Sequence, residues 1–226
     1  MVEAGCEYAV MEVSSQGIKM HRTDGLYFNY AIFTNISPDH IGPGEHADFE
    51  EYLYYKTRLL NMCGIGLVNK DDEHAPQIIK AANCELYTYS EESKEADFVA
   101  SDIRYVSQPD FVGTEFHISG KYDMEVRLGI PGLFNVVNAL AAVSVCSFLG
   151  LDQARISHAL ENIRVNGRME IVYTSERCTV LVDYAHNAVS MESLLSTLRD
   201  YKPKRLVCVF GLSLIHISEP TRHAQI

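Results

Sequence analysis

Short apolar runs alternate with amphipathic segments along the first half of the chain, and this pattern predicts an α/β fold. The runs are rich in β-branched and aromatic residues, as strands are, whereas the segments between them repeat apolar residues at helical spacing. The predicted strands cover residues 8–13, 30–36, 64–69 and 85–89. Helices are predicted from Asp48, as N-cap, to about Met62 and from Asp71 to about Asn83. This alternation is typical of a mostly parallel sheet with crossover helices.

The pattern then changes. Segments near 97–106, 114–119 and 123–129 follow one another without helices between them, so we expect a small antiparallel patch added to the sheet. Two helices are predicted next, at 133–149 and 152–164, and the first begins at a Pro-Gly turn. Together these elements describe one large unit.

A boundary is predicted at VNGR, residues 165–168. Beyond it, the pattern predicts two strands, a helix and a third strand, at 169–174, 179–185, 189–201 and 205–211. These elements read as the opening of a second α/β unit. We therefore expect one domain at 1–166 that is truncated at its N-terminus, and the start of another at 167–211. Residues 212–226 do not continue the α/β rhythm and are interpreted as a non-native tail.

Composition narrows the class of protein. With 47% hydrophobic and 22% charged residues, the chain can bury a sizeable core. Its net charge of −11 is opposite in sign to that of most nucleic-acid or anionic-membrane binders, so we expect neither partner. The chain shows no secretory signal, and its six cysteines contain no CxxC pair. These features favour a cytoplasmic protein with buried free thiols, and we expect a monomer.

Polar residues at the predicted strand ends are candidates for chemistry, because ligands of open α/β sheets bind there. Glu12 closes the first predicted strand, and His40 follows the second. A carboxylate and an imidazole are ligands that suit Mg²⁺ or Mn²⁺ beside phosphates. A purely structural Glu–His hydrogen bond is the alternative, and two residues do not decide between them.

Other candidates have equally plain structural explanations. Lys56 shares a helix face with apolar residues, and such lysines usually extend to solvent. Asn135 and Asn138 lie on one face near a helix start, where Asn135 could act as a cap. Arg168 could bind phosphate or pair with a surface carboxylate. Asp71 and Asp72 could cap a helix. Four histidines are assigned no chemistry: His46, His74, His117 and His158.

Six motifs in order resemble the Mur ligases, most closely the MurE type. They are MEVSSQGI (11–18), FTNISPDHI (33–41), VNKDD (68–72), GLFNVVNALAA (132–142), NGRMEIV (166–172) and VDYAHNA (182–188). The resemblance covers residues 1 to about 211. The chain departs from the family pattern at Gln16, Met20, Ala188 and an insertion-like GPGEHAD (42–48), which shifts the subtype more than the class.

The resemblance implies most of a central ATP-binding domain followed by the start of a Rossmann-like C-terminal domain. The implied enzyme is an acid–amino acid ligase of peptidoglycan synthesis. It adds diaminopimelate or lysine to UDP-N-acetylmuramoyl-L-alanyl-D-glutamate through an acyl phosphate, using ATP and Mg²⁺. No GxxxxGK[ST] phosphate loop occurs, so we expect this chain to be inactive alone. The alternatives are a folylpolyglutamate or cyanophycin synthetase-like ligase and a non-catalytic nucleotide- or metal-binding module.

The resemblance also implies roles for single residues. Glu12, His40 and a carbamylated Lys56 would hold Mg²⁺. His40, Lys56 and Arg168 would serve catalysis. The substrate contacts would be Ser14, Ser15 and Arg22. The ATP contacts would be Asn138, Arg168, Asp183, Tyr184 and His186.

Overall fold

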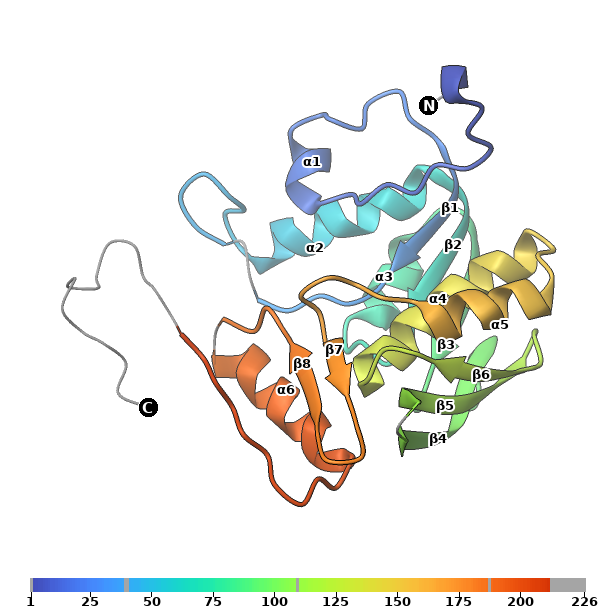
Figure 1. Cartoon of the computed structure of the whole chain (residues 1–226). Helices are drawn as coiled ribbons and strands as arrows, with labels where there is room; N and C mark the ends of the chain where they lie inside the picture. The colour runs from blue at the N-terminus through green and yellow to red at the C-terminus, as the bar shows by residue number, and fades with distance from the viewer. Residues whose placement is uncertain (1, 39–40, 109, 187, 212–226) are drawn as a thin grey trace.

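A six-stranded mixed sheet forms the centre of the molecule. The computed structural model describes residues 2–38, 41–108, 110–186 and 188–211. The strands lie in chain order: β1 (Phe28–Phe33), β2 (Cys63–Asn69), β3 (Glu85–Ser90), β4 (Phe98–Gln108), β5 (Phe111–Gly120) and β6 (Met124–Leu128). Strands β1 to β4 pair in parallel, and β4 to β6 pair antiparallel (Figure 1). The predicted α/β fold and its antiparallel patch are confirmed.

Helices connect and cover the strands. They are α1 (Ser15–Lys19), α2 (Phe49–Arg58), α3 (Ala75–Ala81), α4 (Leu133–Phe148), α5 (Gln153–Asn162) and α6 (Ala188–Asp200), with 3₁₀ turns η1 (Val2–Ala4) and η2 (Leu59–Asn61). The predicted cap of α2 is confirmed, because the Asp48 side chain accepts a 2.8 Å hydrogen bond from the backbone N–H of Glu51. Asp152 caps α5 in the same way, through Arg155.

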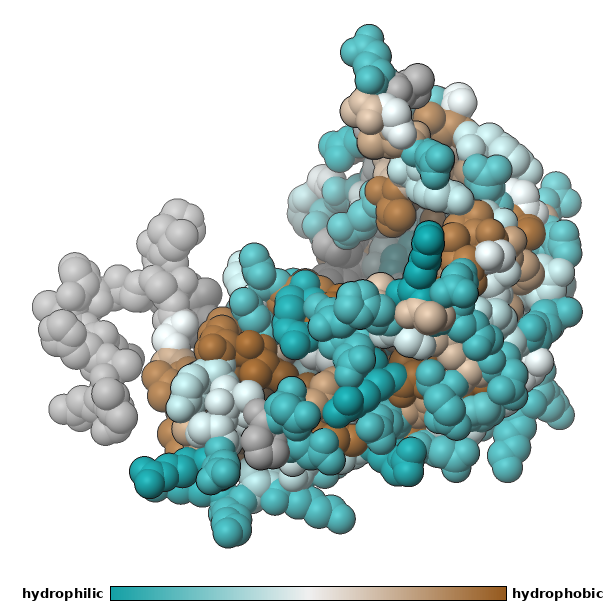
Figure 2. Space-filling view, turned by 45° about the vertical axis from the view of Figure 1, so that its right-hand side comes forward, coloured by the Kyte–Doolittle hydropathy of each residue, from teal (hydrophilic) through white to brown (hydrophobic). Residues whose placement is uncertain are grey.

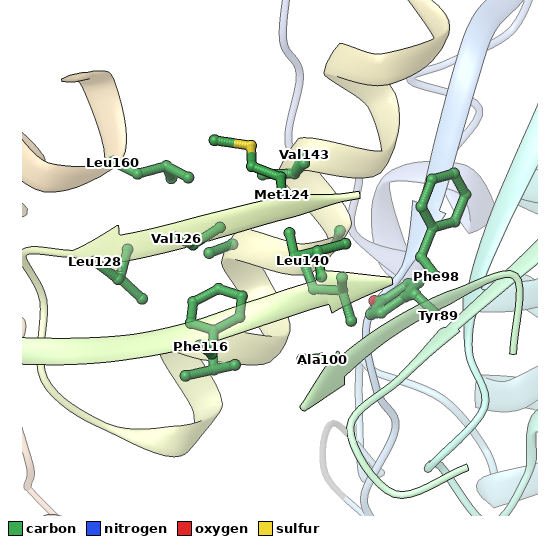
Figure 3. Packing of buried hydrophobic residues seen from close by; sticks show 14 of the residues in the cluster. Tyr89, Phe98, Ala100, Phe116, Met124, Val126, Leu128, Leu140, Val143 and Leu160 are labelled. Carbon is green, nitrogen blue, oxygen red and sulfur yellow. The ribbon is translucent and has the colours of Figure 1, made fainter. Parts of the chain in front are cut away.

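Two hydrophobic cores lie on the two faces of the sheet. Strands β2 to β6 pack against α4 and α5, and Figure 3 shows Phe116, Val126 and Leu128 in the same cluster as Leu140 and Leu160. The second core joins β1 and β2 to α2 and α3. Helices on both faces bury both sides of the parallel strands, as parallel sheets require. Among the described residues, no helix combines the length and the apolar character needed to cross a membrane.

Two predicted strands do not form. Residues 8–13 are irregular, with Tyr8 60% and Val10 102% exposed, and Glu12 is exposed as well rather than closing a buried strand. Residues 205–211 are also irregular, with Val209 89% exposed. Both runs have strand composition, but neither pairs with a described strand. Strand propensity depends on neighbours to pack against and pair with, so composition alone was not enough.

The second unit is small. Strands β7 (Glu170–Thr174) and β8 (Thr179–Val182) form an antiparallel ribbon, and α6 follows. The face in Figure 2 is mostly hydrophilic, and the places where apolar side chains gather on it include the part that holds this unit. The exposed apolar residues of the ribbon include Val172, Tyr173, Val180 and Val182. The predicted strands and helix are thus present, without the third strand.

The cysteines are only partly as expected. All six are free, and Cys63 is buried. Burial raises the pKa of the Cys63 thiol to about 12, with its neighbour Cys84 adding to the shift, so Cys63 stays protonated. The expectation of buried thiols is wrong for Cys6, Cys178 and Cys208, which are exposed because two of them lie in irregular segments and one in the turn of the β7–β8 ribbon.

Candidate functional site

Hydrogen bonds join the carboxyl ends of the parallel strands. The Asn69 side chain, at the end of β2, donates a 2.9 Å bond to the carbonyl of Thr34, which follows β1. The Tyr89 hydroxyl, on β3, donates a 3.0 Å bond to the carbonyl of Phe33. Burial, with help from nearby carboxylates, raises the pKa of Tyr89, so it remains a donor. The residues after β1 are therefore fixed across the edge of the sheet.

Two aspartates extend this edge. One Asp72 oxygen accepts a 2.7 Å bond from the N–H of Ile36, and the other accepts a 2.9 Å bond from the N–H of His74. Asp71 binds the Ser90 hydroxyl and accepts a 2.9 Å bond from the N–H of Glu91. The helix predicted to open at Asp71 begins only at Ala75, because both carboxylates serve the turn before it.

Lys56 lies at the same edge. Its ammonium donates a 2.7 Å bond to the carbonyl of Asn35 and lies over the rings of Tyr52 and Phe33, at 5.2 Å and 5.9 Å from their centroids. The side chain is half-buried. The amine therefore faces the end of β1, where a ligand of the sheet would bind. His40, the predicted metal ligand and catalytic residue, lies outside the described residues.

The predicted metal site is only partly represented. Glu12 stands in an exposed irregular segment. In the described ranges no group of three or more His, Cys, Asp or Glu side chains is placed to hold a metal ion. Of the three expected ligands, the structure locates Lys56 at the strand edge and Glu12 in the segment before α1.

The predicted substrate residues surround α1. The Ser14 hydroxyl caps this helix by accepting a 3.0 Å bond from the N–H of Gly17. The Arg22 guanidinium is exposed and contacts the sulfur of Met20 at 3.2 Å. Ser15, in contrast, is buried, and its hydroxyl lies 2.9 Å from Nε2 of a histidine in the loop before α2, His46.

Sequence reasoning missed His46, which is 0% exposed. Its ring packs on Tyr52 and Tyr55, with centroid distances of 5.2 Å and 5.7 Å, and its Nδ1 lies 3.7 Å from Oε2 of Glu51. His46 lies in a loop, where residue spacing follows no period that would indicate burial. Its place just before the cap of α2 was the only available hint.

Glu51 connects this histidine to α1. Its Oε2 lies 2.8 Å from the ammonium of Lys19 and accepts a 2.7 Å bond from the N–H of Ala47. The hydrogen bond from Lys19, followed by that from Ala47, lowers the pKa of Glu51. The carboxylate therefore stays ionised beside its partners.

A second cluster lies at the domain boundary and brings together four predicted ATP contacts. The Arg168 guanidinium lies 5.1 Å from the centroid of the Tyr184 ring, and the His186 ring lies 5.2 Å from the same ring. Asp183 accepts 2.8 Å bonds from the N–H groups of Met169 and Ala185. The boundary residues and the end of β8 are thereby joined.

Asn138 is exposed on α4 and makes none of these contacts. The Asn135 side chain donates a 2.7 Å bond to the carbonyl of Pro131, just before this helix, so it bonds the residues preceding α4 but does not cap it. Figure 2 shows the surface hollowed between the part that holds α1 and the part that holds the second unit.

Comparison with known proteins decides the family. The Mur ligase middle domain matches residues 1–146, and the Mur ligase glutamate ligase domain matches residues 167–216. This chain belongs to the Mur ligase family. Members of the family are ATP-dependent ligases, generally requiring Mg²⁺. The resemblance inferred from the six ordered motifs is confirmed.

Individual relatives point to one branch of the Mur ligase family. The chain is 36% identical over 211 residues to UDP-N-acetylmuramoyl-L-alanyl-D-glutamate–2,6-diaminopimelate ligase 2 of Clostridium acetobutylicum, covering 93% of this chain and 42% of that protein. It is 35% identical over 212 residues to the corresponding L-lysine ligase of Streptococcus mutans, covering 93% and 41%.

Structural comparison agrees. A solved structure of a diaminopimelate ligase of this kind matches with a TM-score of 0.75 and 29% identity, over 88% of this chain and 41% of that one. The Mur ligase chain described here therefore spans about two fifths of the length of these relatives.

Proposed function

We propose that this chain is part of an ATP-dependent ligase that adds the third amino acid, diaminopimelate or lysine, to UDP-N-acetylmuramoyl-L-alanyl-D-glutamate. The observation that carries the proposal is the similarity to relatives named for these two reactions, which extends over 93% of the chain. The protein would act in the cytoplasm as a monomer, in peptidoglycan synthesis. Two boundaries belong to the same proposal: a central domain at 1–166 and the start of a C-terminal domain at 167–211, with 212–226 as a non-native tail.

The proposed reaction has two steps. A carboxylate oxygen of the dipeptide attacks the γ-phosphorus of ATP, and ADP leaves. The amine of the incoming amino acid then attacks the acyl carbon, loses a proton, and releases phosphate. Both the carboxylate and the triphosphate are anionic, so the first step needs fixed positive charge close to the phosphates.

Residues of the boundary cluster would supply part of that charge. Arg168 carries a permanent positive charge, and its stacking on Tyr184 holds the guanidinium at the junction of the two units. Tyr184 and His186 are exposed aromatic rings that could lie against an adenine. Asp183 and Asn138 would contact the adenine or the ribose.

Lys56 and Glu12 have side chains whose chemistry suits the proposed Mg²⁺ site. Reaction of the Lys56 amine with CO₂ forms a carbamate and releases a proton, which turns a cation into an oxygen donor. With Glu12 and His40, this would give carboxylate, carbamate and imidazole donors, a set that suits Mg²⁺. When bound, the ion would neutralise phosphate charge. Lys56 is the residue of this set whose position at the strand edge supports the proposal.

The dipeptide would lie against α1. Ser14 precedes this helix and Arg22 follows it; both are exposed and would contact the peptide or the uridine diphosphate part. The family resemblance implies a substrate contact for Ser15 as well. Its hydroxyl is buried against His46, so we assign it to the support of α1 instead.

The test is phosphate release by the full-length protein that contains this sequence. We expect release to require ATP, Mg²⁺, the UDP-muramoyl dipeptide and either diaminopimelate or lysine. Release that depends on a folate or on cyanophycin would replace the proposal with one of the related ligases. Nucleotide binding without release of phosphate under any of these conditions would indicate a non-catalytic module.

A further inference from the structure

A polar cluster, buried at two of its four side chains, joins α1 to the start of α2. It consists of Ser15 and Lys19 from α1, His46 from the loop, and Glu51 from α2, and is called the α1–α2 clasp below. Ser15 lies 2.9 Å from His46, and Lys19 lies 2.8 Å from Glu51. Lys19 also donates a 2.9 Å bond to the carbonyl of Glu45, in the loop. Three segments of the chain thus meet through side-chain hydrogen bonds.

Two side chains of the clasp are buried, so their hydrogen bonds matter for the stability of the fold. His46 is 0% exposed and Ser15 is 4% exposed. Polar groups withdrawn from water destabilise the fold unless they are hydrogen-bonded. The position of α1 is therefore specified by its bond to His46, because another position would leave a buried hydroxyl or imidazole without its partner.

The order serine, histidine, carboxylate invites comparison with a nucleophilic triad, but the geometry argues against one. A nucleophile must be accessible to its substrate, and Ser15 is buried. The Nδ1 of His46 lies 3.7 Å from Glu51, beyond the usual length of a hydrogen bond. The clasp therefore positions α1 and does not act as a nucleophilic triad.

The clasp also extends toward Lys56. The buried ring of Tyr52 lies 5.2 Å from the His46 ring and 5.2 Å from the ammonium of Lys56. Tyr52 and Lys56 are four residues apart on α2 and share a face of the helix. One aromatic ring thus separates His46 from Lys56.

We propose that His46 is a positioning residue. It holds α1 in a fixed position relative to the face of α2 that carries Lys56. That α1 binds the UDP-muramoyl dipeptide rests on the function proposed above, whereas the coupling of α1 to α2 does not. His46 would act through Ser15 on one side and through Tyr52 on the other.

Amide hydrogen exchange tests the coupling without a ligand. We expect His46→Leu and Ser15→Ala to speed exchange of the α1 amides about tenfold, the effect of losing one buried hydrogen bond. Exchange in β4 to β6 should not change. His46→Gln, which can still bond Ser15, should restore part of the protection, and the matched control His158→Leu, on the exposed face of α5, should have no effect.

Titration of the full-length protein with the UDP-muramoyl dipeptide tests the consequence for binding. Both variants should bind it about tenfold more weakly than the unaltered chain, since the same bond is lost. If the unaltered full-length protein does not bind the dipeptide, the proposed function fails, and the exchange result still decides the coupling. Unchanged α1 exchange in both variants, or an equal rise throughout β4 to β6, would overturn the proposal. Ser15→Ala removes a single hydroxyl, so it remains informative if His46→Leu does not fold.

Discussion

The Tyr201 hydroxyl, just after α6, donates a 2.9 Å hydrogen bond to the carbonyl of Gly113 on β5. It also lies 3.1 Å from the hydroxyl of Thr114, and the Tyr201 ring packs on Tyr105 of β4 at 5.1 Å between centroids. The second unit is therefore attached to the antiparallel patch of the first by a residue 88 positions away in the chain.

Removing the Tyr201 hydroxyl should weaken this attachment. We expect Tyr201→Phe to lower the free energy of unfolding by about 1–2 kcal/mol, because a buried carbonyl and hydroxyl lose a partner. Urea denaturation measures the change, and Tyr173→Phe, on an exposed part of β7, is the matched control. Equal stability of the Tyr201→Phe variant and the unaltered chain would show that the bond does not hold the two units together.

Alkaline pH should destabilise the protein through the same residue. Burial raises the pKa of Tyr201 from 10.0 to about 12. The folded state therefore keeps a proton that the unfolded state loses, so stability is fully present below pH 10.0 and falls as the pH rises toward about 12. Urea midpoints measured across this range should decline less steeply in Tyr201→Phe. Parallel declines in the two proteins would contradict the prediction.

Acid pH should act through Glu51. The hydrogen bond from Lys19 is the main cause that lowers the pKa of the Glu51 carboxyl. The contribution of the Glu51 carboxylate to stability is therefore present above pH 4.5, the ordinary pKa of this group, and is lost as the pH falls through the lowered pKa. Lys19→Met should raise the pKa of Glu51 toward 4.5, as followed by NMR of the side-chain carbonyl. Lys80→Met, at an exposed position on α3, should leave it unchanged. An unshifted Glu51 in the Lys19 variant would remove Lys19 as the cause.

Lys56 carries the most specific chemical prediction. In the full-length protein, Lys56→Ala should reduce turnover by about 100-fold or more, comparable to the loss of one preorganised charged group in an active site. Acetate or formate should restore part of the activity by replacing the carbamate oxygens, whereas Lys80→Ala should need no rescue. Full turnover of Lys56→Ala without added carboxylate would rule out the carbamate.

Local patterns predicted most elements of the fold correctly. Asp48 was recognised as a cap because it precedes an amphipathic segment, and the structure confirms its bond to Glu51. Residues 8–13 and 205–211 have equally good strand composition, yet they stay irregular. A strand is stabilised by a partner, and the identity of the partner is not contained in the run itself.

The candidate site likewise contains features that the sequence predicts and features that depend on tertiary contacts. Topology places the ends of β1 and β2 at one edge, and the bond between Asn69 and Thr34 shows that their polar residues do meet there. The burial of His46 depends on a contact between α1 and α2 that no residue spacing indicates. The direction of the Lys56 amine likewise follows from the carbonyl it meets, whereas its helical position alone suggested solvent.

Met169 stands between the two units with a backbone φ of 46°, in the left-handed region, and its side chain is 2% exposed. That conformation costs a non-glycine residue about 1–2 kcal/mol. Here it is offset by burial of the side chain and by the bond from its N–H to Asp183. Met169 therefore gives the chain a defined turn where the two units meet, and the bond from Tyr201 to Gly113 adds a second point of attachment between them.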